Sequence, residues 1–306
     1  MQSLWMLVAS FLFSIMGVCV KLASSTYSTS EIVAYRGAIG MGMILLLVRW
    51  QGGTLRTRMA GHHLWRGAVG VSALWLWFYA IGKLPLAMAV TLNYMSPIWI
   101  AAMLFLGAWW KKQRAMEWRL IAAIFMGFIG VVLLLRPSMH ADQLWSGLIA
   151  LSSGWLAALA YLQVRQMGLM GEPEYRVVFY FSVTCAVAGL VGAWAGPLLT
   201  TTTDAPVWHA HQLKGVLLLI VIGLTAASAQ FAMTRAYRLG NTLVTANLQY
   251  AGIIFSSLWD AVIWHDKLAW LSWLGIAVIL LSGLVATFYN ARNNQPAVNN
   301  DPIASE

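Results

Sequence analysis

Charged side chains are scarce in this sequence of 306 residues, of which only 9% are Asp, Glu, Lys or Arg. A soluble globular protein contains about 25% of these residues, so the composition excludes a chain that covers its surface with charge. Hydrophobic residues, in contrast, make up 60% of the sequence. Lipid must therefore contact most of the folded surface, and we expect an integral membrane protein.

Cysteine is also rare, and Cys19 and Cys185 both lie in apolar runs without a metal or redox motif. His62-His63 and His209-x-His211 lack the further ligands that a zinc site needs. The sequence contains no Gly-x-Ser-x-Gly, Walker or Rossmann pattern. We therefore expect no catalytic residue, no metal and no cofactor.

Acidic residues number 10 against 19 basic ones, which gives a net charge of +9. Nucleic-acid binding would need these charges on one face of a soluble domain, but here they lie in short turns between apolar runs. Cytoplasmic loops of membrane proteins are rich in Lys and Arg. The charge therefore predicts contact with a lipid bilayer and no nucleic-acid partner.

A membrane-spanning helix needs roughly 20 mostly apolar residues, and the sequence contains ten such runs. With the N-terminus in the cytoplasm, thirteen of the 19 basic residues, including Arg66, fall on the inner side. This bias predicts a multi-pass protein of the inner (cytoplasmic) membrane with both termini in the cytoplasm. The predicted spans are 4–22, 32–49, 64–82, 86–108, 118–135, 146–163, 177–195, 213–236, 242–263 and 270–288.

The two halves of the sequence resemble each other at two offsets. An offset of 156 residues aligns the third to fifth spans with the eighth to tenth, and an offset of 140 aligns the start of each half. We expect one five-helix repeat over 1–139, a second over 140–289 and a disordered polar tail over 290–306. Because five is odd, the second repeat enters the bilayer from the opposite side, as in many secondary transporters. The aligned residues include Ser72 and Ser228, Tyr94 and Tyr250, Gly127 and Gly283, Trp5 and Trp145, and Tyr35-Arg36 and Tyr175-Arg176.

These features together resemble the EamA-type ten-helix proteins of the drug/metabolite transporter superfamily. The resemblance rests on the two five-helix halves, the paired Tyr-Arg motifs, Ala236-Tyr-Arg-Leu-Gly240, the Tyr94–Pro97 turn and the glycine-rich fifth and tenth helices. It implies a carrier for small metabolites such as amino acids, nucleoside-like compounds or vitamins. It also implies a central cavity between the halves.

The stretch VTLNYMSPIW (90–99) places polar groups and a proline in the middle of a predicted span. Pro97 removes a backbone hydrogen bond and clashes with the carbonyl of Asn93, so we expect a kink there. The matching stretch of the second half (245–254) keeps this polarity with Asn247, Gln249 and Tyr250 but contains no proline. Loosened backbone in a bilayer faces protein or a wet cavity. Asn93, Tyr94, Asn247 and Tyr250 are therefore predicted to bind substrate, although bonding between neighbouring helices is the alternative.

Aromatic side chains at helical spacing supply further candidates for the wall of a cavity. Trp75 and Tyr79 share a face of the third span, Gln230 lies at the corresponding depth of the eighth span, and Trp155 lies deep in the sixth. An aromatic wall with a few polar groups suits a flat or amphipathic ligand. The alternative is packing alone.

Ionisable residues inside spans are costly and often functional. Arg36 either extends towards the membrane surface or holds an anionic group of the substrate. Asp260 is the carboxylate that lies within a predicted span and is the candidate for proton coupling or gating. Arg235 is expected at the cytoplasmic end of its span, next to Arg238.

The sequence therefore predicts a secondary active transporter, or a facilitator, of small organic metabolites that works by alternating access. One alternative is a membrane-embedded enzyme that acts on lipid or isoprenoid substrates, and it would need clustered Asp, Glu or His near an interface. A structural membrane subunit is the other alternative. The substrate, the direction of transport, the coupling ion and the choice between monomer and homodimer stay open.

Overall fold

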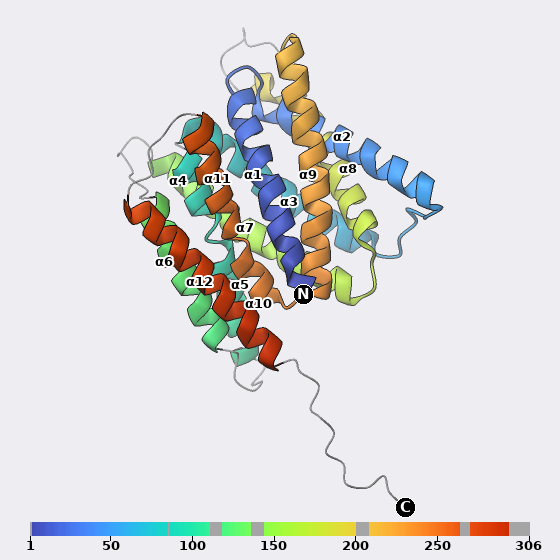
Figure 1. The fold of residues 1–306 in the computed structure, drawn as a ribbon. Coiled ribbons are helices and arrows are strands. Elements are labelled where there is room, and N and C mark those ends of the chain that lie inside the picture. The colour runs from blue at the N-terminus through green and yellow to red at the C-terminus, as the bar shows by residue number, and fades with distance from the viewer. Residues whose placement is uncertain are drawn as a thin grey trace, which may run out of the picture.

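The computed structural model describes residues 2–84, 86–110, 118–135, 144–199, 208–263 and 270–293. Within these ranges it contains a short 3-10 turn and twelve α-helices, and no strand (Figure 1). The elements are η1 (Gln2–Leu4), α1 (Trp5–Ala23), α2 (Thr29–Gln51), α3 (Ala60–Lys83), α4 (Leu86–Asn93), α5 (Ser96–Trp110), α6 (Trp118–Leu135), α7 (Leu144–Leu169), α8 (Glu174–Leu199), α9 (Leu213–Leu239), α10 (Thr242–Leu248), α11 (Ala251–Ile263) and α12 (Trp270–Asn293).

Six helical segments in the described part of the chain are long and apolar enough to cross a membrane. The chain is therefore a multi-pass membrane protein, as its composition predicts. Shorter apolar stretches cover Ala89–Leu104, Ile121–Leu133 and Trp273–Ala286. The six longer segments are Gln2–Ala23, Thr29–Gln51, Ala60–Lys83, Leu144–Leu169, Glu174–Ala195 and Leu213–Leu239.

Several boundaries differ from those that the apolar runs predict. Helix α3 begins at Ala60 rather than at 64, and α8 extends to Leu199. Helix α12 extends to Asn293, so the first four residues of the tail predicted over 290–306 are helical, and the rest of that tail lies outside the described residues. Helices extend beyond the apolar run because backbone hydrogen bonds continue after the side chains become polar.

The helices pack mainly in four pairs. Helix α2 packs against α8, α1 against α9, α3 against α7, and α6 against α12. Figure 1 shows α6 and α12 along one side of the molecule, with α2 and α8 on the other. The helices α1, α3, α7 and α9 lie between these two pairs and carry about half of the buried hydrophobic core.

Helices α2 and α8 approach each other through two glycines. A Cβ atom at Gly37 would lie 2.2 Å from the backbone nitrogen of Ala186, and one at Gly189 would lie 2.3 Å from the backbone nitrogen of Ala34. Small residues allow this close approach, because van der Waals packing rather than the hydrophobic effect holds helices together in lipid. This crossing also positions Arg36, which lies on α2 next to Gly37.

Candidate substrate cavity

The fourth and ninth predicted spans are both broken near their middle. Helix α4 ends at Asn93 and α5 begins at Ser96, while α10 ends at Leu248 and α11 begins at Ala251. Pro97 is the second residue of α5, where the missing N–H of proline is tolerated. The predicted kink is therefore a full break just before the proline. The break in the ninth span forms without any proline.

A cavity lies beside the break between α4 and α5. Its empty volume is about 640 Å³, which includes space open to the outside. Helices α1, α2, α3, α4, α7, α8 and α9 contribute to its wall, together with Gln249 at the second break. The lining residues are Met6, Phe13, Met16, Arg36, Arg66, Gly70, Ala73, Leu74, Trp77, Asn93, Tyr94, Ala157, Ala160, Tyr161, Phe181, Gln230 and Gln249.

The polar residues at the two breaks are tied to neighbouring helices. Asn93 Nδ2 donates a hydrogen bond of 2.9 Å to Ser153 Oγ on α7. Gln249 Nε2 donates one of 3.2 Å to Ser96 Oγ, which joins the second break to the first. The Oε1 atom of Gln249 and the Nε2 atom of Gln230 are buried and have no hydrogen-bond partner in the described part of the chain. The residues that line the cavity therefore include polar atoms whose hydrogen bonds the described protein does not satisfy.

Two arginines lie in the same cavity. Arg36 and Arg66 are 4% and 2% exposed, and their guanidinium carbons lie 5.2 and 4.1 Å from the centre of the Phe181 ring. Arg36 Nη1 also contacts Cys185 Sγ at 3.2 Å. Arg36 is thus turned into the protein rather than towards the membrane surface. The sequence predicts Arg66 on the inner side, near the end of a span that starts at 64, but α3 begins at Ala60, so Arg66 lies deeper in the helix and is buried.

The structure brings some of the predicted binding residues together and separates others. Asn93, Tyr94, Gln230 and Arg36 line the cavity. Tyr79 and Trp155 are 39% and 45% exposed and lie outside it, on helix faces that the described part of the chain leaves uncovered.

Three further candidates, of which Asn247 and Tyr250 are buried and Trp75 is partly buried, lie in contacts between helices and do not line the cavity. The ring of Trp75 occupies the space that a Cβ of Gly192 would need, at 2.2 Å. Asn247 Oδ1 lies 2.9 Å from Ser282 Oγ, and Tyr250 is completely buried. These three side chains pack helices together.

Gln249 lines the cavity, as the polarity of its stretch indicates. Several other lining residues are absent from the sequence-based prediction, including Arg66, Trp77, Tyr161 and Phe181. A weak signal exists for Trp77, which lies two residues from Trp75. The sequence does not distinguish the faces of these helices, since lipid and protein interior are both apolar.

Two other ionisable candidates have limited structural support. Asp260 belongs to α11, but its side chain lies outside the described residues. The guanidinium carbon of Arg235 lies 5.2 Å from the centre of the Trp5 ring, away from the cavity lining. Arg238 Nη1 forms an ion pair with Glu174 Oε2 at 2.6 Å.

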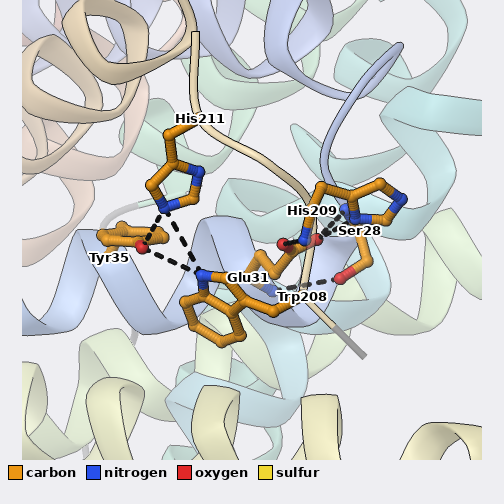
Figure 2. A network of polar contacts seen from close by, with 6 residues as sticks. All are labelled: Ser28, Glu31, Tyr35, Trp208, His209 and His211. Carbon is orange, nitrogen blue, oxygen red and sulfur yellow. Dashed lines mark hydrogen bonds and ion pairs between the residues drawn. The ribbon is translucent and has the colours of Figure 1, made fainter. Parts of the chain in front are cut away.

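A polar network joins the start of α2 to the segment before α9 (Figure 2). Glu31 Oε1 accepts a hydrogen bond of 2.6 Å from the backbone N–H of His209, and Glu31 Oε2 lies 2.7 Å from His209 Nδ1. Glu31 and Ser28 also form a capping box, in which each side chain binds the backbone N–H of the other. One buried carboxylate thus holds both the helix start and the incoming segment.

The same network continues one turn along α2. The Tyr35 hydroxyl contacts His211 Nε2 and accepts a hydrogen bond of 3.0 Å from Trp208 Nε1. Figure 2 shows the three rings grouped beside Glu31. His209 and His211, for which the sequence suggests no metal site, therefore bind side chains of α2. Among the described residues, no group of three His, Cys, Asp or Glu side chains is placed to hold a metal ion.

A second polar cluster lies near the other end of α2. His63 Nε2 lies 2.9 Å from Glu172 Oε1, and Arg176 Nε donates a hydrogen bond of 2.9 Å to the carbonyl oxygen of Thr54. His62 Nδ1 contacts Gln163 Nε2 at 2.9 Å. The start of α8 therefore holds the segment before α3, just as the start of α2 holds the segment before α9.

A membrane chain that is helical throughout its described residues, with a partly polar cavity between its helices, has the features of a membrane transporter. Known proteins identify the family. The profile of the EamA-like transporter family matches residues 1–136. The pseudopaline exporter CntI of Pseudomonas aeruginosa is 34% identical over 261 residues, which cover 85% of this chain and 86% of the relative. The chain therefore belongs to the EamA-like transporter family of the drug/metabolite transporter superfamily.

More distant similarities agree with this assignment. A riboflavin transporter of Vibrio cholerae is 26% identical over 302 residues, which cover 96% of this chain and 95% of the relative. A solved crystal structure with 19% identity superposes with a TM-score of 0.75 over 94% of this chain and 98% of the other, which shows a shared fold. The protein is a transporter of small metabolites and not an enzyme.

Proposed function

We propose that the protein is a carrier with ten membrane spans, arranged as two inverted five-helix repeats over 1–139 and 140–289. In this proposal α4 with α5, and α10 with α11, each form one broken span. The packing of the helices supports it. Exchanging the repeats converts the α1–α9 contact into the α7–α3 contact, and it leaves the α2–α8 and α6–α12 contacts unchanged. The family profile, which ends at residue 136, matches the length of the first repeat.

We place the protein in the inner (cytoplasmic) membrane. In the proposed orientation both termini lie in the cytoplasm. The loop that contains Arg56 and Arg58 is then cytoplasmic. The cluster of His63 and Glu172 lies at the cytoplasmic end, and the network of Glu31 and His209 lies at the outer end.

The cavity is the proposed substrate site, and its position between the two proposed repeats is the main support for the proposal. Side chains from both repeats form its wall, and two lining side chains, Gln230 on α9 and Gln249 at the second break, carry buried polar atoms without a partner in the described part of the chain. A site between inverted repeats, formed at broken helices, is the arrangement that alternating access requires. The related proteins are named as carriers of pseudopaline and riboflavin, which supports an organic substrate of metabolite size here.

Metabolite profiling of cells with and without the protein would identify candidate substrates, and uptake of each candidate into proteoliposomes would test transport directly. Tyr94 lines the cavity, and Tyr79 is the matched control because it is an exposed tyrosine outside it. Tyr94→Ala should reduce uptake about tenfold, whereas Tyr79→Ala should leave it near the wild-type value. Wild-type uptake by Tyr94→Ala would reject this cavity as the substrate site. A structural subunit would show no uptake in any variant.

Asp260 remains the candidate for proton coupling. In proteoliposomes with an imposed pH gradient, Asp260→Asn should abolish any dependence of uptake on the gradient. A dependence that persists in this variant would exclude Asp260 as the coupling group.

A further inference from the structure

Two positive charges lie close together in the wall of the cavity. Arg36 and Arg66 come from different helices, yet both guanidinium groups lie over the ring of Phe181, at 5.2 and 4.1 Å. Helix α3 accommodates the second group because residue 70 is glycine. A Cβ atom there would lie 1.8 Å from Arg66 Nη1. The sequence thus leaves room for a guanidinium group beside the cavity.

Most of the buried hydrogen-bond donors on these arginines have no acceptor. Arg66 Nε, Arg66 Nη1 and Arg36 Nε are buried without a partner. The bond from Arg36 Nη1 ends on the sulfur of Cys185, which is a weak acceptor. A buried charge normally has a partner that compensates for the loss of water. The ring of Phe181 offers cation–π attraction but no hydrogen-bond acceptor.

Carboxylates in the described part of the chain are committed elsewhere. Glu31 contacts His209, Glu172 contacts His63 and Arg176, and Glu174 contacts Arg238. Among the described residues, therefore, no Asp or Glu side chain forms an ion pair with either cavity arginine.

We infer that the transported substrate carries an anionic group, a carboxylate or a phosphate, which binds between Arg36 and Arg66. The planar fork of donors on arginine matches the oxygens of both groups. The uncharged amides of Asn93, Gln230 and Gln249, with the ring of Trp77, would then contact the rest of an organic molecule. This inference rests on the proposed function, because it assumes that the cavity is the substrate site.

The test uses the full chain in proteoliposomes and a bacterial metabolite extract. Anion exchange at alkaline pH separates the extract into a retained fraction, which includes amino acids as carboxylates, and a neutral and cationic flow-through. Mass spectrometry then identifies the compounds that accumulate above protein-free liposomes. Phosphatase treatment of the retained fraction distinguishes phosphate monoesters, whose uptake it removes, from carboxylates, whose uptake persists.

Uptake should come from the retained fraction, and Arg66→Gln or Arg36→Gln should reduce it about tenfold or more, since hydrogen bonds to charged groups are strong. Arg66→Lys, which keeps the charge but loses the fork, should retain part of the activity. Arg235→Gln is the matched control, because Arg235 lies on a spanning helix but does not line the cavity. Thermal unfolding reports whether each variant is folded, and the wild-type comparison of the two fractions stands without any variant.

Accumulation of compounds that come only from the flow-through and carry neither group would overturn the anion inference while the carrier function stands. Equal uptake by the wild type and a folded Arg66→Gln variant would overturn it as well. No uptake from either fraction would reject the proposed function itself.

Discussion

Glu31 holds residue His209 by two hydrogen bonds, one from the backbone N–H at 2.6 Å and one with the imidazole Nδ1 at 2.7 Å. The Glu31 side chain is completely buried, and its Oε2 atom also accepts the backbone N–H of Ser28 at 2.8 Å. The carboxylate that caps α2 therefore also binds the segment that leads into α9. Loss of the bonds from Glu31 would loosen the contact between α2 and the segment before α9.

Replacement of His209 tests this contact. His209→Ala removes the imidazole but keeps the hydrogen bond from the backbone N–H. The free energy that holds the segment against α2 should therefore fall by about 1–3 kcal/mol, the contribution of a hydrogen bond to a charged group. We expect faster hydrogen–deuterium exchange of residues 208–212 and of the first turn of α2, with no change in the middle of α3. His62→Ala is the control, because His62 contacts Gln163 near the other end of α2. Unchanged exchange at 208–212 would show that the backbone bond alone holds the segment.

The break between α4 and α5 depends on a glycine of α7. A Cβ atom at Gly154 would lie 2.8 Å from the carbonyl oxygen of Asn93 and 2.9 Å from that of Leu92. Gly154→Ala should therefore destabilise the protein by about 1–3 kcal/mol, as overpacking does, because backbone rather than a flexible side chain must shift. Thermal unfolding in detergent measures the change.

Gly42 provides the matched control for that substitution. It also lies within a helix, but no heavy atom lies within 4 Å of the Cβ position. Gly42→Ala should stabilise α2 by about 0.5–1 kcal/mol. Equal melting temperatures for the two variants would contradict the packing at the break.

The positions of the helices follow largely from the apolar runs. The span predicted over 213–236 lies inside α9, and the break near Pro97 follows from the chemistry of proline. The depth of Arg66 does not follow from them. Counting basic residues near span ends places Arg66 at the membrane surface, but α3 begins at Ala60 and carries it almost two turns into the helix. Helix length beyond the apolar run is set by neighbours that the run does not show.

The sequence also does not determine which face of a helix meets the cavity. Trp75 and Trp77 lie on nearly opposite sides of α3, because two residues correspond to about 200° of rotation. Both sides of the helix are apolar and both contact protein here, since Trp75 packs against Gly192 of α8 and Trp77 lines the cavity. The hydrophobic pattern therefore favours neither, and the same ambiguity explains the exposed position of Trp155 on α7.

Two tryptophans test this assignment of faces. Trp77 lines the cavity, whereas Trp155 is 45% exposed on the outside of α7. Trp77→Ala should reduce uptake of the identified substrate by about tenfold, because the substitution removes the contact area of the indole ring and its shape complementarity to the ligand. Trp155→Ala should change uptake by less than about twofold, as surface substitutions usually have small effects. A larger loss of uptake in Trp155→Ala would contradict the orientation of α7.

Two asparagines that the sequence predicts to bind substrate should differ in their effects. Asn93 lines the cavity, so Asn93→Ala should reduce uptake per folded molecule about tenfold, with a modest loss of stability because its bond to Ser153 is lost.

Asn247 on α10 instead packs against α12 and α6. Its Oδ1 atom lies 2.9 Å from Ser282 Oγ, and a Cβ at Gly127 would lie 2.9 Å from the same oxygen. Asn247→Ala should therefore lower the free energy of unfolding by about 1–3 kcal/mol. Its uptake per folded molecule should stay within about twofold of the wild type, because no contact with the substrate is removed. Initial uptake rates normalised to folded protein, with unfolding followed by intrinsic fluorescence, separate the two effects. If Asn247→Ala lost uptake as strongly as Asn93→Ala while remaining folded, the second helix break would belong to the substrate site and not to the packing around it.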